Sequence, residues 1–288
     1  MPHANVNGLK LYYEEAGRGT PLLFVHEFAG DYRSWEDQMR FFARRYRAIA
    51  FSARGYLPSD VPERPEQYGQ MPQVEDVRGL LDALKIDRAH ICGLSMGSYT
   101  TLLFGLHHPE RARSLTVAGC GYGSGGKREE FHAEVHAVSE QMLKGGMAGV
   151  ADTYTLGPAR VQFQNKDPIG WKRFRDYFAE HSAKGSAYTL RAVQMQRPSV
   201  YDLEPQLRKL EVPTLILNGD EDEPCLEPGL FMKRAIPYAG LELFPKTGHT
   251  LNLEEPGRFN ASLLAFLTAV DAGAWPKRDP RSLADKTV

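Results

Sequence analysis

The chain alternates short, mostly apolar runs with segments whose apolar residues recur at helical spacing. The apolar runs cover residues 21–25, 48–51, 89–93, 114–118 and 214–218. Nearly continuous apolar runs of this length, without alternation of polar residues, are typical of parallel strands that are covered on both faces, because neither face then meets water. Between and after these runs, helical spacing is found in residues 74–84, 99–106 and 259–270. The pattern predicts an α/β fold with a doubly wound, mostly parallel sheet.

The alternation stops between residues 121 and 205. This stretch opens with a glycine-rich loop, residues 121–126, and continues with an apolar stripe at helical spacing made by Phe131, Val135, Val138 and Met142. We therefore expect residues 1–120 and 206–288 to form the core and residues 121–205 to form a helical cap inserted over the sheet. The polar, proline-containing tail after Ala272 is expected to be a surface extension or partly disordered.

Composition excludes several classes of function. With 42% hydrophobic residues among 288, the chain can bury a large core. Its 36 acidic and 35 basic residues nearly cancel, so no overall field favours nucleic acid or an anionic membrane. The cysteines Cys92, Cys120 and Cys225 form no CxxC pair and predict neither a disulfide framework nor a zinc site. With no signal peptide and no apolar run long enough to span a bilayer, we expect a cytoplasmic protein.

The most specific motif is Gly93-Leu94-Ser95-Met96-Gly97, which lies between an expected strand and an expected helix. This GxSxG pattern in a strand–turn–helix context is that of a nucleophile elbow. The glycines allow a tight turn that other side chains would obstruct. The serine hydroxyl then projects beside a helix N-terminus, where N–H groups favour developing negative charge. We expect Ser95 to be the nucleophile.

A serine hydroxyl needs a base that a third group holds in orientation. In this arrangement the acid and then the histidine follow the serine along the chain. His249 fits the base, since it follows a strand-like run, residues 241–244, and precedes the last helical pattern. Acid candidates follow the strand at residues 214–218, and spacing alone does not choose between Asp220 and Asp222.

The elbow, the segment Gly219–Asp222 after a strand and the stretch Gly248–Pro256 make the chain resemble the α/β-hydrolase superfamily over essentially its whole length. The match is to the esterase, haloperoxidase-like and enol-lactonase-like branches. In these branches the acid is typically the aspartate three residues after the glycine that closes the strand, so the resemblance implies Asp222. Some relatives take the acid from the strand before the cap, but residues 118–121 contain no carboxylate here.

The resemblance also implies an oxyanion hole made by two backbone N–H groups. The family usually has His-Gly before the residue that supplies the first N–H, which is Phe28 here, and Met96 after the nucleophile supplies the second. This chain departs from the family by placing Glu27 where the glycine is expected.

A second departure accompanies the first. The family often has an aspartate two residues before the Arg-Gly that follows the next strand, and this chain has Ser52 there, while Arg54 is kept. We hypothesise that Glu27 pairs with Arg54 or caps nearby N–H groups and so braces the oxyanion loop, because an unpaired carboxylate at a buried strand end is costly. The alternatives are a proton-transfer role and a solvated bystander.

These features predict a serine hydrolase that needs no cofactor or metal and cleaves carboxylic ester bonds of small molecules through an acyl-enzyme. Lactonase or enol-lactonase, perhydrolase and carbon–carbon bond hydrolase activities use the same triad and stay open. Epoxide hydrolase and dehalogenase chemistry is disfavoured, because those relatives use an aspartate nucleophile. The non-enzyme alternative is a small-molecule receptor built on a degenerate hydrolase fold. Expected partners are a small ester or lactone, without nucleic acid or membrane, and the protein is expected to be a monomer or homodimer.

Overall fold

The computed structural model describes residues 2–283 and has at its centre a sheet of eight strands in the order β1-β2-β4-β3-β5-β6-β7-β8. The N-terminal strands β1 and β2 pair antiparallel, as do β2 and β4, and all the other pairs are parallel. The strands are β1 (His3–Val6), β2 (Leu9–Ala16), β3 (Pro21–Val25), β4 (Arg47–Phe51), β5 (Ala89–Leu94), β6 (Ala112–Ala118), β7 (Thr214–Gly219) and β8 (Ala239–Phe244).

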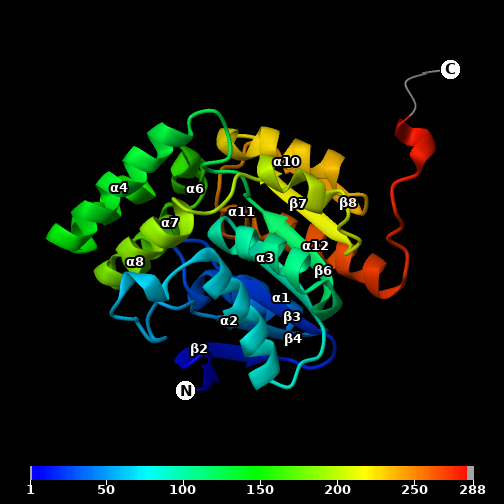
Figure 1. Ribbon diagram of the computed structural model, residues 1–288, viewed down its shortest axis with the longest axis horizontal. Coiled ribbons are helices and arrows are strands. Elements are labelled where there is room, and N and C mark those ends of the chain that lie inside the picture. Colours follow the sequence, from blue (N-terminus) through cyan, green and yellow to red (C-terminus); the bar gives the residue numbers. More distant parts are fainter. Residues whose placement is uncertain (1, 284–288) are drawn as a thin grey trace.

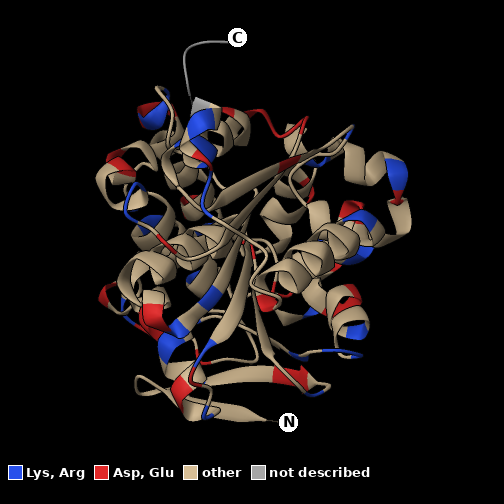
Figure 2. Ribbon diagram, turned by 90° about the vertical axis from the view of Figure 1, so that its right-hand side faces the viewer, with Lys and Arg blue, Asp and Glu red and all other residues tan. Residues whose placement is uncertain are grey.

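Helices cover both faces of this sheet, as the nearly continuous apolar runs predict. Within β3, Leu22 and Phe24 belong to the core on one face, and Leu23 and Val25 belong to the core on the other. The first face is covered by α1 (Glu36–Phe42) and α12 (Pro256–Asp271), and the second by α2 (Gln70–Ala83), α3 (Met96–His107) and α10 (Glu223–Ala235). The central strands β3 to β7 are thereby almost wholly buried, and Figure 2 shows the charged residues mostly away from the sheet.

Between β6 and β7 the described chain contains helices and turns and no strand. The helices gather beyond one end of the sheet, in green in Figure 1. They are α4 (Arg128–Gly145), α5 (Ala148–Thr155), α6 (Val161–Lys166), α7 (Pro168–Ala179) and α8 (Ala183–Thr189), with a 3₁₀ turn at Pro158–Arg160. A π-helix at Leu190–Gln194, a 3₁₀ turn at Tyr201–Leu203 and α9 (Glu204–Leu207) lead back toward β7. We call residues 121–205 the cap from here on.

The predicted α/β fold is confirmed, and the differences lie at the periphery. The antiparallel hairpin of β1 and β2 is not predicted by the apolar runs, because its outer strand alternates exposed and buried residues and β2 ends in exposed ones. At the other end, α11 (Leu251–Glu254) precedes α12, and a 3₁₀ turn, Pro280–Leu283, lies in the tail. Residues 284–288 of the tail are outside the described residues. No helix within residues 2–283 is both long and apolar enough to cross a membrane.

Gly97 offers a test of how closely α3 must approach the sheet. A Cβ added at Gly97 would lie 2.1 Å from the carbonyl oxygen of Val25, so Gly97→Ala must push helix and strand apart. We expect a loss of about 1–3 kcal/mol in the free energy of unfolding, the usual cost of overpacking. Urea unfolding followed by circular dichroism measures it.

The matched control is Gly257→Ala in α12, where an added Cβ meets no atom within 4 Å. That substitution should leave stability unchanged or raise it by about 0.5–1 kcal/mol through helix propensity. Equal effects of the two substitutions would contradict the close approach of α3 to β3.

Candidate active site

Ser95 lies on a strained turn between β5 and α3. Its backbone has φ +56° and ψ −114°, which is unusual for a residue with a side chain, and its N–H donates to the Ala118 carbonyl at 2.8 Å. The turn is compact because Gly93 and Gly97 have no side chains, and a Cβ on Gly93 would lie 2.2 Å from the Gly97 carbonyl oxygen. Strain at a strand end that presents a hydroxyl is characteristic of functional sites.

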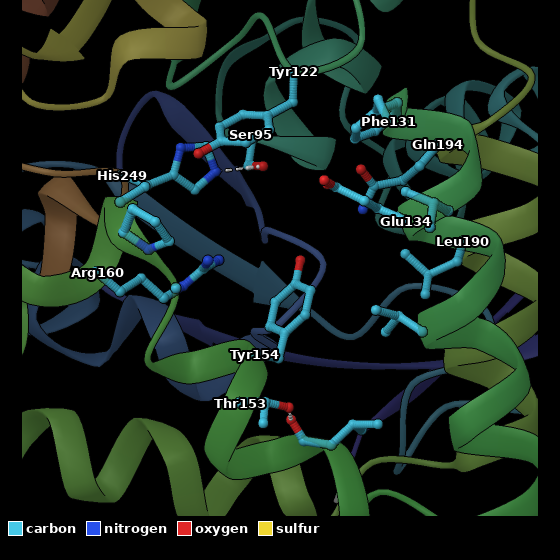
Figure 3. Close-up of a pocket in the computed structure, with 16 residues that line it drawn as sticks. Ser95, Tyr122, Phe131, Glu134, Thr153, Tyr154, Arg160, Leu190, Gln194 and His249 are labelled. Carbon is cyan, nitrogen blue, oxygen red and sulfur yellow. Dashed lines mark hydrogen bonds between the residues drawn. The ribbon is translucent and has the colours of Figure 1, made fainter. Parts of the chain in front are cut away.

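Two hydrogen bonds join Ser95 to His249 and His249 to Asp222. The Ser95 Oγ lies 2.7 Å from His249 Nε2, the contact drawn as a dashed line in Figure 3. On the other side of the ring, His249 Nδ1 lies 2.7 Å from Asp222 Oδ2. An ionised carboxylate only accepts, so Nδ1 carries the hydrogen and Nε2 is free to accept from the serine hydroxyl. Ser95 follows β5, Asp222 follows β7 and His249 follows β8, so the three groups come from the carboxyl ends of parallel strands at the same edge of the sheet.

Asp222 is fully buried, yet it stays ionised. Burial by itself would raise its pKa, but the charge and the hydrogen bond of His249 outweigh this and hold the pKa of Asp222 below its ordinary value. Asp220, the other acid that the sequence leaves open, is exposed and accepts from the Thr247 N–H at 3.2 Å. Asp222 therefore contacts the histidine, and Asp220 does not.

Ser95 and His249 open onto a cavity of about 320 Å³. The cap supplies most of its wall, from α4, α5, the segment 157–160 and the π-helix. Apolar lining residues are Phe131, Val135, Val138, Val150 and Leu190, and polar ones are Tyr122, Glu134, Thr153, Tyr154, Arg160 and Gln194. Figure 3 shows Arg160 and Tyr154 near the His249 side and Glu134 and Gln194 across from them. The cavity has the size and mixed lining of a small-molecule site.

The amide of Phe28 belongs to the loop after β3 and that of Met96 to the first residue of α3, and Gly97 of α3 closely approaches the carbonyls of Val25 and His26 at the start of that loop. Within residues 2–283, neither N–H donates to a protein atom, which leaves both able to bind an oxygen. The Phe28 side chain is buried beneath the cap, with its ring centroid 5.5 Å from Tyr154 and 6.0 Å from Phe178. Packing against the cap therefore fixes the residue that carries the first amide.

Glu27 does not pair with Arg54, and this part of the prediction is wrong. Arg54 instead holds Asp76 on α2 through two hydrogen bonds of 2.6 Å. Glu27 pairs with Arg160 of the cap, with 2.6 Å between Glu27 Oε2 and Arg160 Nη2, and its side chain is 1% exposed. Sequence reasoning missed Arg160 because the two residues are 133 positions apart and no motif marks the arginine.

One group of side chains in the described part of the chain has the spacing of a metal site. Asp222, Cys225 and His249 each place a donor atom within 4.8 Å of the others. The hydrogen bond between Asp222 and His249 already uses one donor atom of each of these residues. The burial that surrounds Cys225 raises the pKa of its thiol well above the ordinary value, which keeps it a protonated, unreactive neighbour of the acid.

Comparison with known proteins places this geometry in a family. A family model of the alpha/beta hydrolase fold matches residues 20–147. The dihydrolipoyllysine-residue acetyltransferase component of the acetoin cleaving system of Pseudomonas putida is 30% identical over 271 residues, covering 92% of this chain and 68% of that protein. The chain belongs to the α/β hydrolase family.

Two further similarities indicate which branch of the family this α/β hydrolase resembles. It is 28% identical over 247 residues to 3-oxoadipate enol-lactonase 2 of Acinetobacter baylyi, covering 85% of this chain and 88% of that one. The crystal structure of the enol-lactonase from Burkholderia xenovorans LB400 superimposes with a TM-score of 0.82 at 26% identity, covering 93% of this chain and all of that one. The predicted resemblance to the enol-lactonase and esterase-like branch is confirmed, and such relatives support hydrolysis of small molecules.

The histidine that precedes Glu27 predicts how stability depends on pH. His26 accepts from the Ala53 N–H through Nε2 at 3.0 Å, and its Nδ1 lies 2.6 Å from the Glu27 carbonyl oxygen. Its complete burial lowers its pKa from 6.5 to about 4. Between pH 6.5 and about 4, His26 is therefore protonated in the unfolded chain and neutral in the folded protein. Its contribution to stability is fully present above pH 6.5 and is lost as the pH falls toward 4.

We expect His26 to account for about 3 kcal/mol of this loss. The measurement is urea unfolding at pH 7.0, 5.5 and 4.5 for the wild type and for His26→Gln, which keeps an acceptor but cannot be protonated. His90, whose pKa burial also lowers to about 4, contributes to both curves. The slope of the free energy of unfolding against pH should decrease in the variant by the equivalent of about one proton. Identical slopes in the two proteins would contradict the assignment of the pH dependence to His26.

Proposed function

We propose that this α/β hydrolase is a serine hydrolase that cleaves carboxylic ester bonds of small molecules. The observation that supports this most directly is the continuous pair of 2.7 Å hydrogen bonds from Ser95 through His249 to Asp222, at the wall of a cavity that can hold a small substrate. The similarity to two enol-lactonases also supports a hydrolase function.

In the proposed mechanism, His249 takes the proton from Ser95 as Oγ attacks the ester carbonyl carbon. The tetrahedral intermediate collapses when the C–O bond to the alcohol breaks and His249 protonates the leaving oxygen. Water then attacks the acyl-enzyme, gives a proton to His249, and the Ser95 Oγ leaves as the carboxylic acid forms. Asp222 holds the imidazole tautomer and stabilises the imidazolium in both halves of the reaction.

The amides of Phe28 and Met96 form the proposed oxyanion hole. Both are without a protein acceptor in residues 2–283, and main-chain donors are fixed before charge develops, so they need no reorganisation during the reaction. Ser95 immediately precedes α3, so the N-terminus of that helix adds a favourable dipole on the same side.

The cavity supports a small substrate with an apolar acyl portion, and lactones are a second candidate class. A lactone is an intramolecular ester, so the same attack opens the ring and leaves the alcohol tethered to the acyl group. The observation that favours lactones is the similarity to two proteins named as enol-lactonases. Since the cap supplies most of the lining, we also propose that residues 121–205 act as the substrate-shaping unit on the core of residues 1–120 and 206–288.

Substitution of the triad tests the proposal. Ser95→Ala should abolish turnover of short-chain p-nitrophenyl esters and labelling by a fluorophosphonate probe, and Asp222→Asn should reduce kcat by about 10⁴-fold by allowing the wrong histidine tautomer. Asp220→Asn is the matched control, since its carboxylate contacts Thr247 and not His249. A panel of esters and lactones of graded acyl length separates the two substrate classes.

Unchanged turnover in Ser95→Ala would overturn the proposal. So would comparable losses in Asp220→Asn and Asp222→Asn. A wild-type protein that binds the panel compounds without turnover would instead support the small-molecule receptor alternative.

A further inference from the structure

The contact between Glu27 and Arg160 is a buried ion pair that joins the core to the cap. The side chains are 1% and 8% exposed, and 2.6 Å separates Oε2 from Nη2. Glu27 immediately precedes Phe28, whose amide is a proposed oxyanion donor. The ion pair therefore restrains the loop whose Phe28 amide is proposed to stabilise the oxyanion.

The segment that carries Arg160 also contacts the loop of the proposed base. Arg160 ends the 3₁₀ turn Pro158–Arg160, and the carbonyl of the preceding residue, Ala159, accepts from the His249 N–H at 2.7 Å. A Cβ on Gly248 would lie 2.2 Å from the same carbonyl oxygen, so the two segments are in close contact. One short piece of the cap is thus bonded to both loops that surround Ser95.

Aromatic rings hold the guanidinium of Arg160 in place. Its Cζ lies 5.0 Å from the ring centroid of Tyr154 and 5.7 Å from that of Phe174, distances at which cation–π attraction operates. In Figure 3 the side chain extends from beneath His249 toward Tyr154. Glu27 is thus paired with a guanidinium that lies against two aromatic rings.

Stability alone does not account for such a pair. Burying two charges costs roughly what their attraction returns, and apolar residues of similar size often do as well. Fixing a geometry is a role that apolar residues would not perform, because ion pairs with hydrogen bonds are directional. Glu27 has one hydrogen bond to a described side chain, through Oε2, while its buried Oε1 has none. The position of the Glu27 side chain thus depends on Arg160.

We propose that Arg160 is a positioning residue of the cap, which acts through Glu27 to hold the Phe28 amide where the oxyanion forms. This proposal rests on the serine hydrolase function proposed above. It makes the cap part of the catalytic arrangement as well as the wall of the substrate cavity.

The test is a double-mutant cycle with Glu27→Gln, Arg160→Met and the double variant Glu27→Gln/Arg160→Met. kcat is measured per serine titrated by the fluorophosphonate, so unfolded protein does not lower the value. Glu27 does not line the cavity, so Glu27→Gln should lower kcat about 10- to 100-fold with KM changed less than threefold. The double variant contains no uncompensated charge and should be no slower than Arg160→Met, because both changes release the same loop.

The matched control is Lys184→Gln, which removes an exposed ion pair between the cap and Glu63 of the core, away from the cavity. Its kcat per titrated serine should stay within twofold of the wild type. Thermal unfolding of all variants gives the structural comparison.

Three results would overturn the positioning role. They are a kcat within twofold of the wild type in Glu27→Gln, losses that multiply in the double variant, and a loss of equal size in Lys184→Gln. Failure of the proposed function itself is distinguishable, because the wild type would then neither turn over esters or lactones nor take up the probe at Ser95.

Discussion

The close approach of α3 to the ends of β3 and β5 is the constraint on which the candidate site depends. Gly97 lies against the Val25 carbonyl and Gly93 against the Gly97 carbonyl, at distances that no Cβ would permit. This contact fixes the turn between them and forces Ser95 into its strained conformation. The same contact places the start of α3 beside the loop that follows β3, so the proposed nucleophile and both candidate amides come from one packed junction.

The cap adds contacts to the core loops on both sides of this junction. Its segment 157–167 is bonded to the loop that carries Glu27 and Phe28 through Arg160 and to the His249 loop through Ala159. Lys166 adds an ion pair of 3.0 Å to Glu254, whose other carboxylate oxygen accepts from the Gly248 N–H at 2.9 Å. Because core loops have few neighbours beyond the sheet edge, contacts of this kind decide how firmly they are held. Movement of the cap would therefore displace both loops.

The sequence predicted those features that depend on local pattern. Apolar runs and helical spacing predicted the central strands β3 to β7 and the helices α2, α3 and α12, and the glycines around Ser95 predicted the elbow, because strand–turn–helix geometry is specified by adjacent residues. The resemblance selected Asp222 from two acids, and Asp222 is the one that contacts His249. The partner of Glu27 could not be predicted, since the arginine lies in the cap and the pairing depends on how a helical insertion packs over the sheet. Arg54 was the nearer candidate along the chain, but Asp76 on α2 holds it.

This pairing explains how a carboxylate can occupy the oxyanion loop without harming the proposed chemistry. A free Glu27 charge beside the Phe28 amide would oppose an oxyanion, because like charges in a buried site repel strongly. The guanidinium of Arg160 neutralises it, as Arg54 neutralises Asp76, and Asp222 is left as the carboxylate bonded to His249. Each of these three buried carboxylates thus has its own cation or imidazole. If Arg160 were lost while Glu27 stayed ionised, the loop would be both released and made electrostatically unfavourable, so the arginine matters more to the site than its distance along the chain from Ser95 suggests.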